Sequence, residues 1–117
     1  MARYQQCQTP RGVLRVKVAD RFWTRALGLL VGKPLEVTEG LLIAPCSSIH
    51  TIGMRYAIDV VFVDDAGRVM RVCPDVRVGR MRFAPGACGV LELRSGVASE
   101  HGLAPGVQLS ELATELR

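Results

Sequence analysis

The sequence predicts an α+β fold: a compact, strand-rich domain with a curved antiparallel or mixed sheet and one main helix near residues 20–31. Short apolar runs, alternating or continuous, recur along the chain at lengths typical of strands. Twelve glycines and six prolines among 117 residues supply many turns. Only the segment near residues 20–31 is long enough and suitably spaced for a substantial helix. With 49% hydrophobic and 22% charged residues, we expect one globular domain over residues 1–117 with a single core.

The N-terminal part of the chain predicts one strand followed by the main helix. Residues 12–18 alternate between apolar and polar side chains, as a half-buried strand does. The next apolar side chains lie three and four positions apart, at Ala19, Phe22, Trp23, Ala26, Leu27 and Leu30. This spacing places them on one face of an amphipathic helix. Asp20 can cap its start, and Gly32 with Pro34 ends it.

The middle of the chain predicts three strands, at residues 40–44, 59–64 and 68–73. Residues 59–64 have apolar side chains in both alternating positions, so we expect this strand to be covered on both faces. The turn of residues 65–67 joins it to the next strand as a hairpin. We expect residues 49–53 to be extended.

The C-terminal part predicts one long strand and several short elements. Residues 90–94 form the strand, after an irregular or edge-like stretch at residues 74–85. Residues 95–101 favour one or two helical turns capped by Ser95. Residues 106–109 predict a last short strand, and residues 110–117 a helical or frayed tail. The residues that we expect to be buried lie on the predicted helix and strands: Phe22, Leu27, Leu30, Leu42, Val61, Phe62, Leu91 and Leu93.

The net charge is +4, and all cations except Lys17 and Lys33 are arginines. Five of the arginines lie within residues 68–82: Arg68, Arg71, Arg77, Arg80 and Arg82. Such a segment can bind an anionic partner, although a solvated edge is the commoner explanation. No aromatic stacking motif accompanies it, so a nucleic acid is the less favoured partner.

Several classes of protein and site are not expected. No apolar run reaches the roughly 18 residues that a membrane span needs, so we expect no membrane partner. The N-terminus has no apolar signal-peptide core, so we expect a cytoplasmic protein. The four cysteines, Cys7, Cys46, Cys73 and Cys88, form no close pair, so we expect neither a metal site nor a disulfide framework. We expect no cofactor.

Polar and reactive side chains are densest in residues 46–59, where an extended segment leads into an apolar strand. The candidate ligand-binding residues are His50, Thr51, Met54, Arg55 and Asp59, together with Glu92 from a later strand. Buried polar groups need partners or solvent, and a cleft supplies both. The simpler alternative is that His50 and Asp59 only fasten a loop through hydrogen bonds.

Cys46, His50 and Asp59 are also candidate catalytic residues. Cys46 and His50 are four residues apart, which in a strand separates their Cα atoms by roughly 13 Å. Direct activation of the thiol by the imidazole therefore requires a bend at Ser47 and Ser48.

Four motifs follow one another along the chain: residues 25–31; Leu35 with residues 39–43; residues 49–55 followed by residues 58–63; and residues 90–93 with Gly96, Gly102 and Gly106. In this order they resemble the family of unknown function DUF192, whose first segment reads R-x-x-G-L-M. The match covers roughly residues 13–110. Many members have Trp-Met-Lys-Asn-Thr where this chain has Ile49-His50-Thr51, and a Gly-Asp where it has Gly106-Val107. Many are also exported with a signal segment. The resemblance implies a compact, β-rich α+β fold and no particular activity.

Three functions fit these residues. The favoured one is a small binding or accessory domain with a polar cleft around residues 46–59, whose partner is a small molecule or a protein. The alternative is a hydrolase-type enzyme that uses His50 with Asp59 or Cys46. A further alternative is an anionic-partner binder that acts through the basic segment of residues 68–82.

Overall fold

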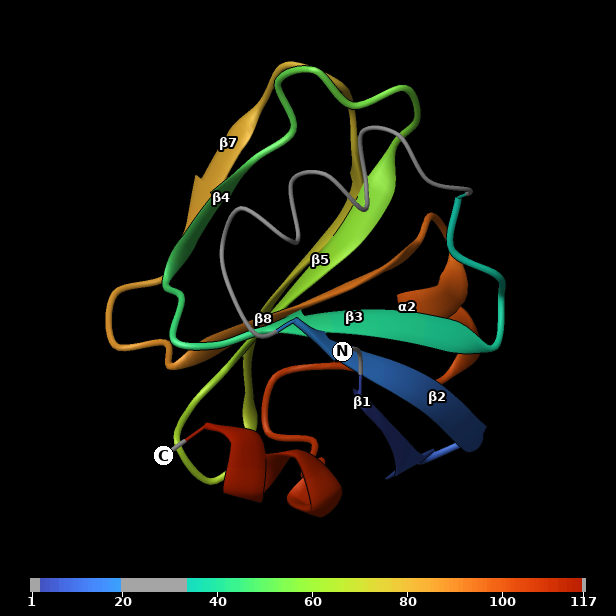
Figure 1. Ribbon diagram of the computed structural model, residues 1–117, viewed down its shortest axis with the longest axis vertical. Helices are drawn as coiled ribbons and strands as arrows, with labels where there is room; N and C mark the ends of the chain where they lie inside the picture. The colour runs from blue at the N-terminus through green and yellow to red at the C-terminus, as the bar shows by residue number, and fades with distance from the viewer. Residues whose placement is uncertain (1–2, 20–33, 117) are drawn as a thin grey trace.

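A mixed six-stranded sheet forms the centre of the molecule (Figure 1). The computed structural model describes residues 3–19 and 34–116. Across the sheet the strands are β1 (Arg3–Thr9), β2 (Gly12–Ala19), β3 (Glu39–Ile43), β8 (Gly89–Arg94), β5 (Ile58–Val63) and β6 (Val69–Val76). The pair β2–β3 is parallel and every other neighbouring pair is antiparallel. The predicted mixed sheet is confirmed.

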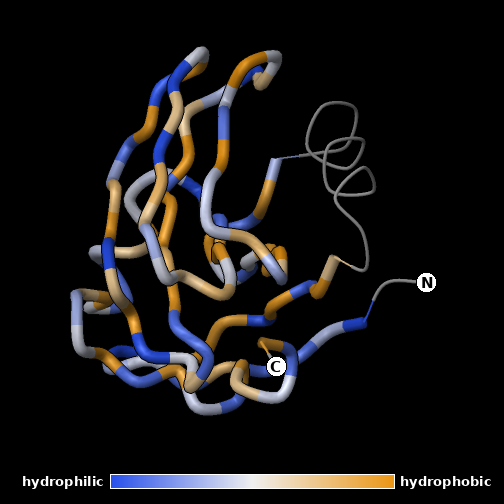
Figure 2. The backbone as a smooth tube through the Cα atoms, turned by 90° about the vertical axis from the view of Figure 1, so that its left-hand side faces the viewer, coloured by the Kyte–Doolittle hydropathy of each residue, from blue (hydrophilic) through white to orange (hydrophobic). Residues whose placement is uncertain are grey.

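Two further strands, β4 (Ser48–His50) and β7 (Met81–Phe83), pair with each other and form a separate ribbon. In Figure 1 this ribbon lies at the upper left, apart from the main sheet. In Figure 2 hydrophobic colour reaches the loops at the top of the molecule, which in Figure 1 follow β4 and precede β7. The ribbon occupies the stretches predicted as extended and edge-like.

The helical elements of the described residues are short: α2 (Val97–Glu100) and the 3-10 helix η1 (Ser110–Glu115). No helix among them is both long and apolar enough to cross a membrane. The predicted helix at residues 20–31, with Phe22, Leu27 and Leu30, lies outside the described residues.

The apolar side chains of the described residues form two clusters, where the sequence predicts a single core. The helix-side cluster consists of Cys7, Leu14, Val16, Leu42, Val61, Val63, Val69, Leu91, Leu93, Val97, Ala98, Leu103, Leu109, Leu112 and Leu116. The ribbon-side cluster consists of Ala19, Leu41, Ile43, Ile49, Met54, Ile58, Val60, Phe62, Cys73, Val76, Ala84 and Val90. Neighbouring residues of one strand belong to different clusters, so the clusters lie on opposite faces of the sheet. The expectation of one core is wrong because β5 and β8 carry apolar side chains on both faces.

Burial of the central strands agrees with the sequence. All six residues of β5 are buried, as predicted for a strand covered on both faces. The predicted core residues that the structure describes, Leu42, Val61, Phe62, Leu91 and Leu93, have no exposed surface.

The β5–β6 hairpin is confirmed, and its turn shows why the sequence favours it. The Asp64 carboxylate accepts hydrogen bonds from the amides of Ala66 and Arg68, each at 2.9 Å. Gly67 has a φ of +80°, and a Cβ there would clash with the carbonyl of Leu109. An aspartate before a glycine is therefore suited to this turn.

The structure differs from the predictions in three other elements. β1 was not predicted, because only Cys7 of its residues is buried and its sequence is mainly polar. Residues 106–109 do not form a strand, and only an isolated bridge joins Gln108 to Arg68. Ser95 does not cap α2, whose N-cap is Gly96.

Candidate functional site

The segment of residues 46–59 leaves the main sheet after β3, forms β4, turns at residues 51–54 and enters β5. It divides its predicted site residues into two groups. Thr51, Met54 and Asp59 are buried, whereas His50 and Arg55 are exposed. The segment therefore does not bring all five side chains to one place.

Asp59 is buried and fastens three backbone groups. Its Oδ1 accepts a hydrogen bond from the amide of Asp75 at 2.8 Å. Its Oδ2 accepts bonds from the amides of Gly96 at 3.0 Å and Ala98 at 2.9 Å. The carboxylate thus satisfies two free amides at the start of α2, which is the role predicted for Ser95. The hydroxyl of Ser95 instead donates to the Asp75 carboxylate at 2.6 Å.

Thr51 is fully buried and joins the turn at residues 51–54 to the loop before β7. Its hydroxyl donates to the carbonyl of Arg77 at 2.6 Å and accepts from the amide of Arg80 at 2.9 Å. Its backbone amide donates to the Arg80 carbonyl at 2.8 Å, and its carbonyl accepts from Gly79 at 3.2 Å. These bonds hold the end of the ribbon in one geometry.

His50 lies on the outer face of the ribbon, opposite Met81. The neighbouring Ile49 points inward, into the ribbon-side cluster. Cys46 also packs against that cluster, and its thiol donates to the carbonyl of Ser48 at 2.9 Å. Cys46 and His50 therefore point to different sides of the ribbon.

Asp59 and Glu92 point to opposite faces of the main sheet. Asp59 is paired in register with Leu93 of the helix-side cluster, whereas Glu92 is paired with Leu41 and Val60 of the ribbon-side cluster. Glu92 has no exposed surface. The structure thus places Asp59 away from both His50 and Glu92.

Tyr56 lies close to Glu92 and was not predicted as a site residue. Burial raises the pKa of the Tyr56 hydroxyl above 10.0, and the negative charge of Glu92 adds to the rise. Among the described residues, no group forms a hydrogen bond with the buried Oη. Its signal in the sequence is an aromatic residue with a polar tip directly before a buried strand.

The predicted basic segment of residues 68–82 is dispersed over the structure. Arg68 lies at the β5–β6 turn. The Nη1 atoms of Arg71 and Arg82 donate to the carbonyls of Phe83 and Met81, each at 2.6 Å. Arg77 and Arg80 are exposed in the loop before β7.

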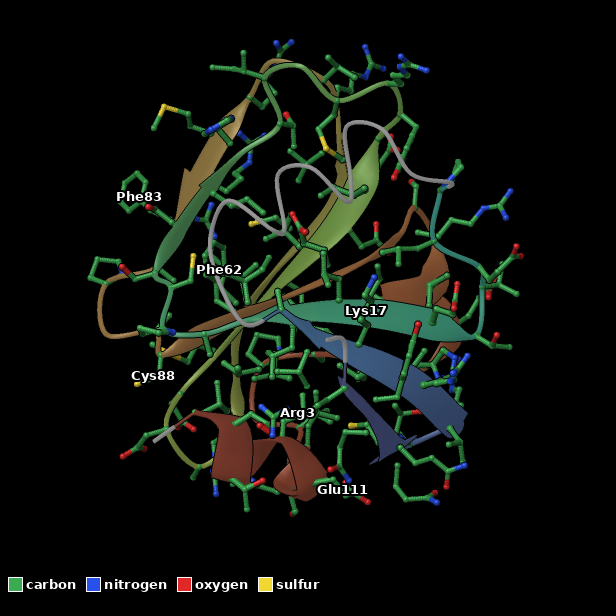
Figure 3. All side chains as sticks on the ribbon, in the orientation of Figure 1. Arg3, Lys17, Phe62, Phe83, Cys88 and Glu111 are labelled. Carbon is green, nitrogen blue, oxygen red and sulfur yellow. The ribbon has the colours of Figure 1, made fainter. Side chains whose placement is uncertain are left out.

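Exposed apolar side chains gather on the ribbon and its loops. Ile52 is 59% exposed, Val78 43%, Met81 65% and Phe83 61%. In Figure 3 the Phe83 ring points away from the main sheet. With Arg55, Arg77 and Arg80, these four side chains form what we call the ribbon surface. Sequence reasoning missed Met81 and Phe83, although they alternate with Arg82 as an exposed strand edge does.

The part of the chain that the structure describes contains no set of side chains suited to bind a metal ion. No three His, Cys, Asp or Glu side chains gather there closely enough to hold an ion.

Comparisons with known proteins agree on the fold and assign no activity. The model of the family DUF192, described as "Uncharacterized ACR, COG1430", matches residues 5–110. No curated protein matches the chain. The chain is similar in structure to a protein of unknown function from Novosphingobium aromaticivorans DSM 12444, with 23% identity, a TM-score of 0.76, and coverage of 92% of this chain and 83% of that one.

A second similar structure is a protein from Sinorhizobium meliloti 1021 described as a "putative transcription regulator". Its identity is 18%, its TM-score is 0.77, and the match covers 92% of each chain. At these identities the two structures show a shared fold and nothing about activity.

Proposed function

This chain belongs to the DUF192 family, whose function is unknown, and we propose that it is a binding module that docks a partner protein on its ribbon surface. The observation that carries the proposal is the exposure of Ile52, Val78, Met81 and Phe83 together on the ribbon and its loops. Of the seven large apolar side chains exposed among the described residues, these four lie on the ribbon and its loops, and the other three lie on β1, β2 and the segment before β3: Tyr4, Val13 and Val37. Exposed apolar patches with a polar rim are typical of interaction sites.

The composition of the ribbon supports a protein partner. Residues 46–58 and 76–91 contain no Lys, Asp or Glu, while they contain Met, Phe and four arginines. Protein interfaces are enriched in aromatic residues, Met and Arg, and depleted in Lys, Asp and Glu. Among the exposed members of residues 46–59, Ile52 and Arg55 belong to this surface.

The ribbon is also held rigidly, which favours binding. Thr51 fastens its loops, and Arg71 and Arg82 satisfy two carbonyls at the edge of β7. A surface that is ordered before binding loses less conformational entropy on docking.

A hydrolase has less support from the geometry. Asp59 is occupied by three backbone amides, and the Cys46 thiol is bonded to the Ser48 carbonyl. His50 lies on the far side of the ribbon from both. The predicted nucleophile, base and acid, Cys46, His50 and Asp59, therefore do not converge.

The proposal can be tested with short random peptides displayed on phage and selected on the immobilised protein. We expect the enriched peptides to bind the ribbon, so that the double substitution Met81→Ser and Phe83→Ser weakens their binding by about tenfold or more. The matched control is Val13→Ser with Val37→Ser, two valines that are 43% and 47% exposed on other parts of the molecule. Peptides that bind the ribbon variant as well as the wild type, or a selection without enrichment, would refute the proposal.

A further inference from the structure

Three arginines of the ribbon surface have no internal counterion. Arg55, Arg77 and Arg80 are exposed, and none of their side chains forms a hydrogen bond or ion pair with the described residues. Two other arginines have side-chain partners: Arg3 pairs with Glu115 at 2.7 Å, and Arg15 lies 3.7 Å above the ring of Tyr4. The three guanidinium groups are therefore available to an external anion.

The acidic residues nearest in sequence form no ion pair with them. Asp59 is buried and its oxygens accept backbone amides. The Asp75 carboxylate accepts the hydroxyl of Ser95. Since the segments that form the ribbon contain no acid between residues 76 and 91 or between residues 46 and 58, the ribbon surface carries a net positive charge.

Resting on the proposed function, we propose that the docked partner segment is an acidic peptide that also carries large apolar side chains. Its carboxylates face Arg55, Arg77 and Arg80, which can bind them through two parallel N–H···O bonds. Its apolar side chains cover Met81 and Phe83, which lie on the strand rather than in the loops. Opposite charge steers the peptide to the surface and raises the association rate, and burial of the apolar side chains supplies affinity.

The apolar part of the surface distinguishes this partner from the other anionic macromolecules. A nucleic acid offers phosphates to the arginines, but a duplex has little to bury a Met and a Phe that are more than half exposed. An anionic bilayer offers a uniform charged layer, whereas here the unpaired arginines come from the loops and the largest exposed apolar side chains from the strand. An acidic peptide can match this uneven arrangement along its length.

The test uses the peptides selected on the wild-type protein. We expect them to be rich in Asp and Glu interleaved with Phe, Leu or Trp, and to bind more weakly at high salt. The charge reversals Arg77→Glu and Arg80→Glu should weaken their binding by about tenfold or more, because they remove attraction and add repulsion. Arg11→Glu with Arg68→Glu is the matched control, since both side chains are exposed and lie at the β1–β2 and β5–β6 turns.

The outcomes separate this inference from the proposed function. Neutral or basic peptides that still require Met81 and Phe83 would overturn the acidic partner and leave the binding module standing. Two other probes are a short DNA duplex and phosphatidylcholine vesicles with and without phosphatidylglycerol. If the selection yields no acidic peptides, and the duplex or only the phosphatidylglycerol vesicles bind in a way that depends on Arg77 and Arg80, the acidic peptide is overturned in favour of a nucleic acid or an anionic membrane. A selection with no ribbon-dependent peptide would remove both proposals.

Discussion

Asp59 and Glu92 are the two buried carboxylates of the described residues, and the alternation of the strands directs them to opposite faces of the sheet. The sequence indicates that Asp59 lies at the start of an apolar strand and that Glu92 interrupts another. It could not show that Asp59 bonds to amides 16, 37 and 39 residues away, because those contacts depend on the tertiary fold. One carboxylate that accepts three amides fastens β6 and α2 to β5.

Replacing Asp59 by asparagine tests this fastening. The amide group keeps one acceptor oxygen but turns a donor towards buried amides, so we expect the free energy of unfolding to fall by about 3 kcal/mol. Urea unfolding followed by circular dichroism measures it. Asp65→Asn, in an exposed turn position, is the control and should change stability by less than about 0.5 kcal/mol. Equal effects of the two substitutions would show that the three bonds contribute nothing.

Cys7 gives the fold a dependence on alkaline pH. Burial raises the pKa of its thiol from 9.0 to about 12, and the negative charge of Glu111 adds to the rise. The folded state thus favours the neutral thiol, so its contribution to stability is complete below pH 9 and is lost as the pH rises towards 12.

We expect Cys7→Ala to flatten the fall in melting temperature above pH 9, while lowering the melting temperature at neutral pH because a buried atom is lost. Cys88→Ala, at a half-buried position, should keep the wild-type slope. Thermal unfolding across this pH range compares the three proteins. An unchanged slope in Cys7→Ala would contradict the assignment.

The ribbon is an element that depends on side chains as much as on strand pairing. Its two strands have three residues each, and an isolated pair of such length is marginal. The hydroxyl of Thr51 and the guanidinium groups of Arg71 and Arg82 add bonds that the strands cannot make themselves. The ribbon can therefore stand outside the main sheet.

Thr51→Val keeps the shape of the side chain and removes its hydroxyl. The Arg77 carbonyl and the Arg80 amide each lose a partner, so we expect a loss of about 1–3 kcal/mol in stability. Hydrogen exchange should become faster at the amide of Arg80 before it does in β5. Thr38→Val, at an exposed position, should leave both measurements unchanged. Uniform acceleration across β5 and the ribbon would show that the Thr51 hydroxyl does not act locally.

The elements show which parts of the structure a sequence can predict. The β5–β6 hairpin is predictable because its turn and its apolar pattern are local. The ribbon surface is not, because Met81 and Phe83 are identified by exposure, and exposure depends on what the rest of the fold leaves uncovered. Polar residues are dense in residues 46–59, but the sequence could not show that Thr51 and Asp59 are buried and bonded to backbone groups while His50 and Arg55 are exposed.

At the scale of the whole molecule, one sheet separates two apolar clusters. Adjacent residues such as Val60 and Val61 pack in different clusters, although one peptide bond joins them. The apolar run in β5 predicts this cover on both faces. The two clusters also stay separate at the edges of the sheet, and the sequence could not show this.

We expect Val60→Ala and Val61→Ala each to lower the free energy of unfolding by about 1–3 kcal/mol. Because their side chains pack in different clusters, the double variant should equal the sum of the single variants to within about 0.5 kcal/mol. Chemical denaturation of the four proteins measures the coupling. A larger coupling would show that the two clusters respond as one.

β8 is the last strand in chain order, yet it lies between β3 and β5 in the sheet. During synthesis the hairpins β1–β2 and β5–β6 can form as soon as they leave the ribosome, since their contacts are local. The two halves of the sheet can join only after residues 89–94 have emerged, and until then the apolar edges of β3 and β5 are open to association with other chains. Ribosome-bound chains that expose residues up to 88 should therefore be digested readily by protease, and chains that expose the full length should resist it.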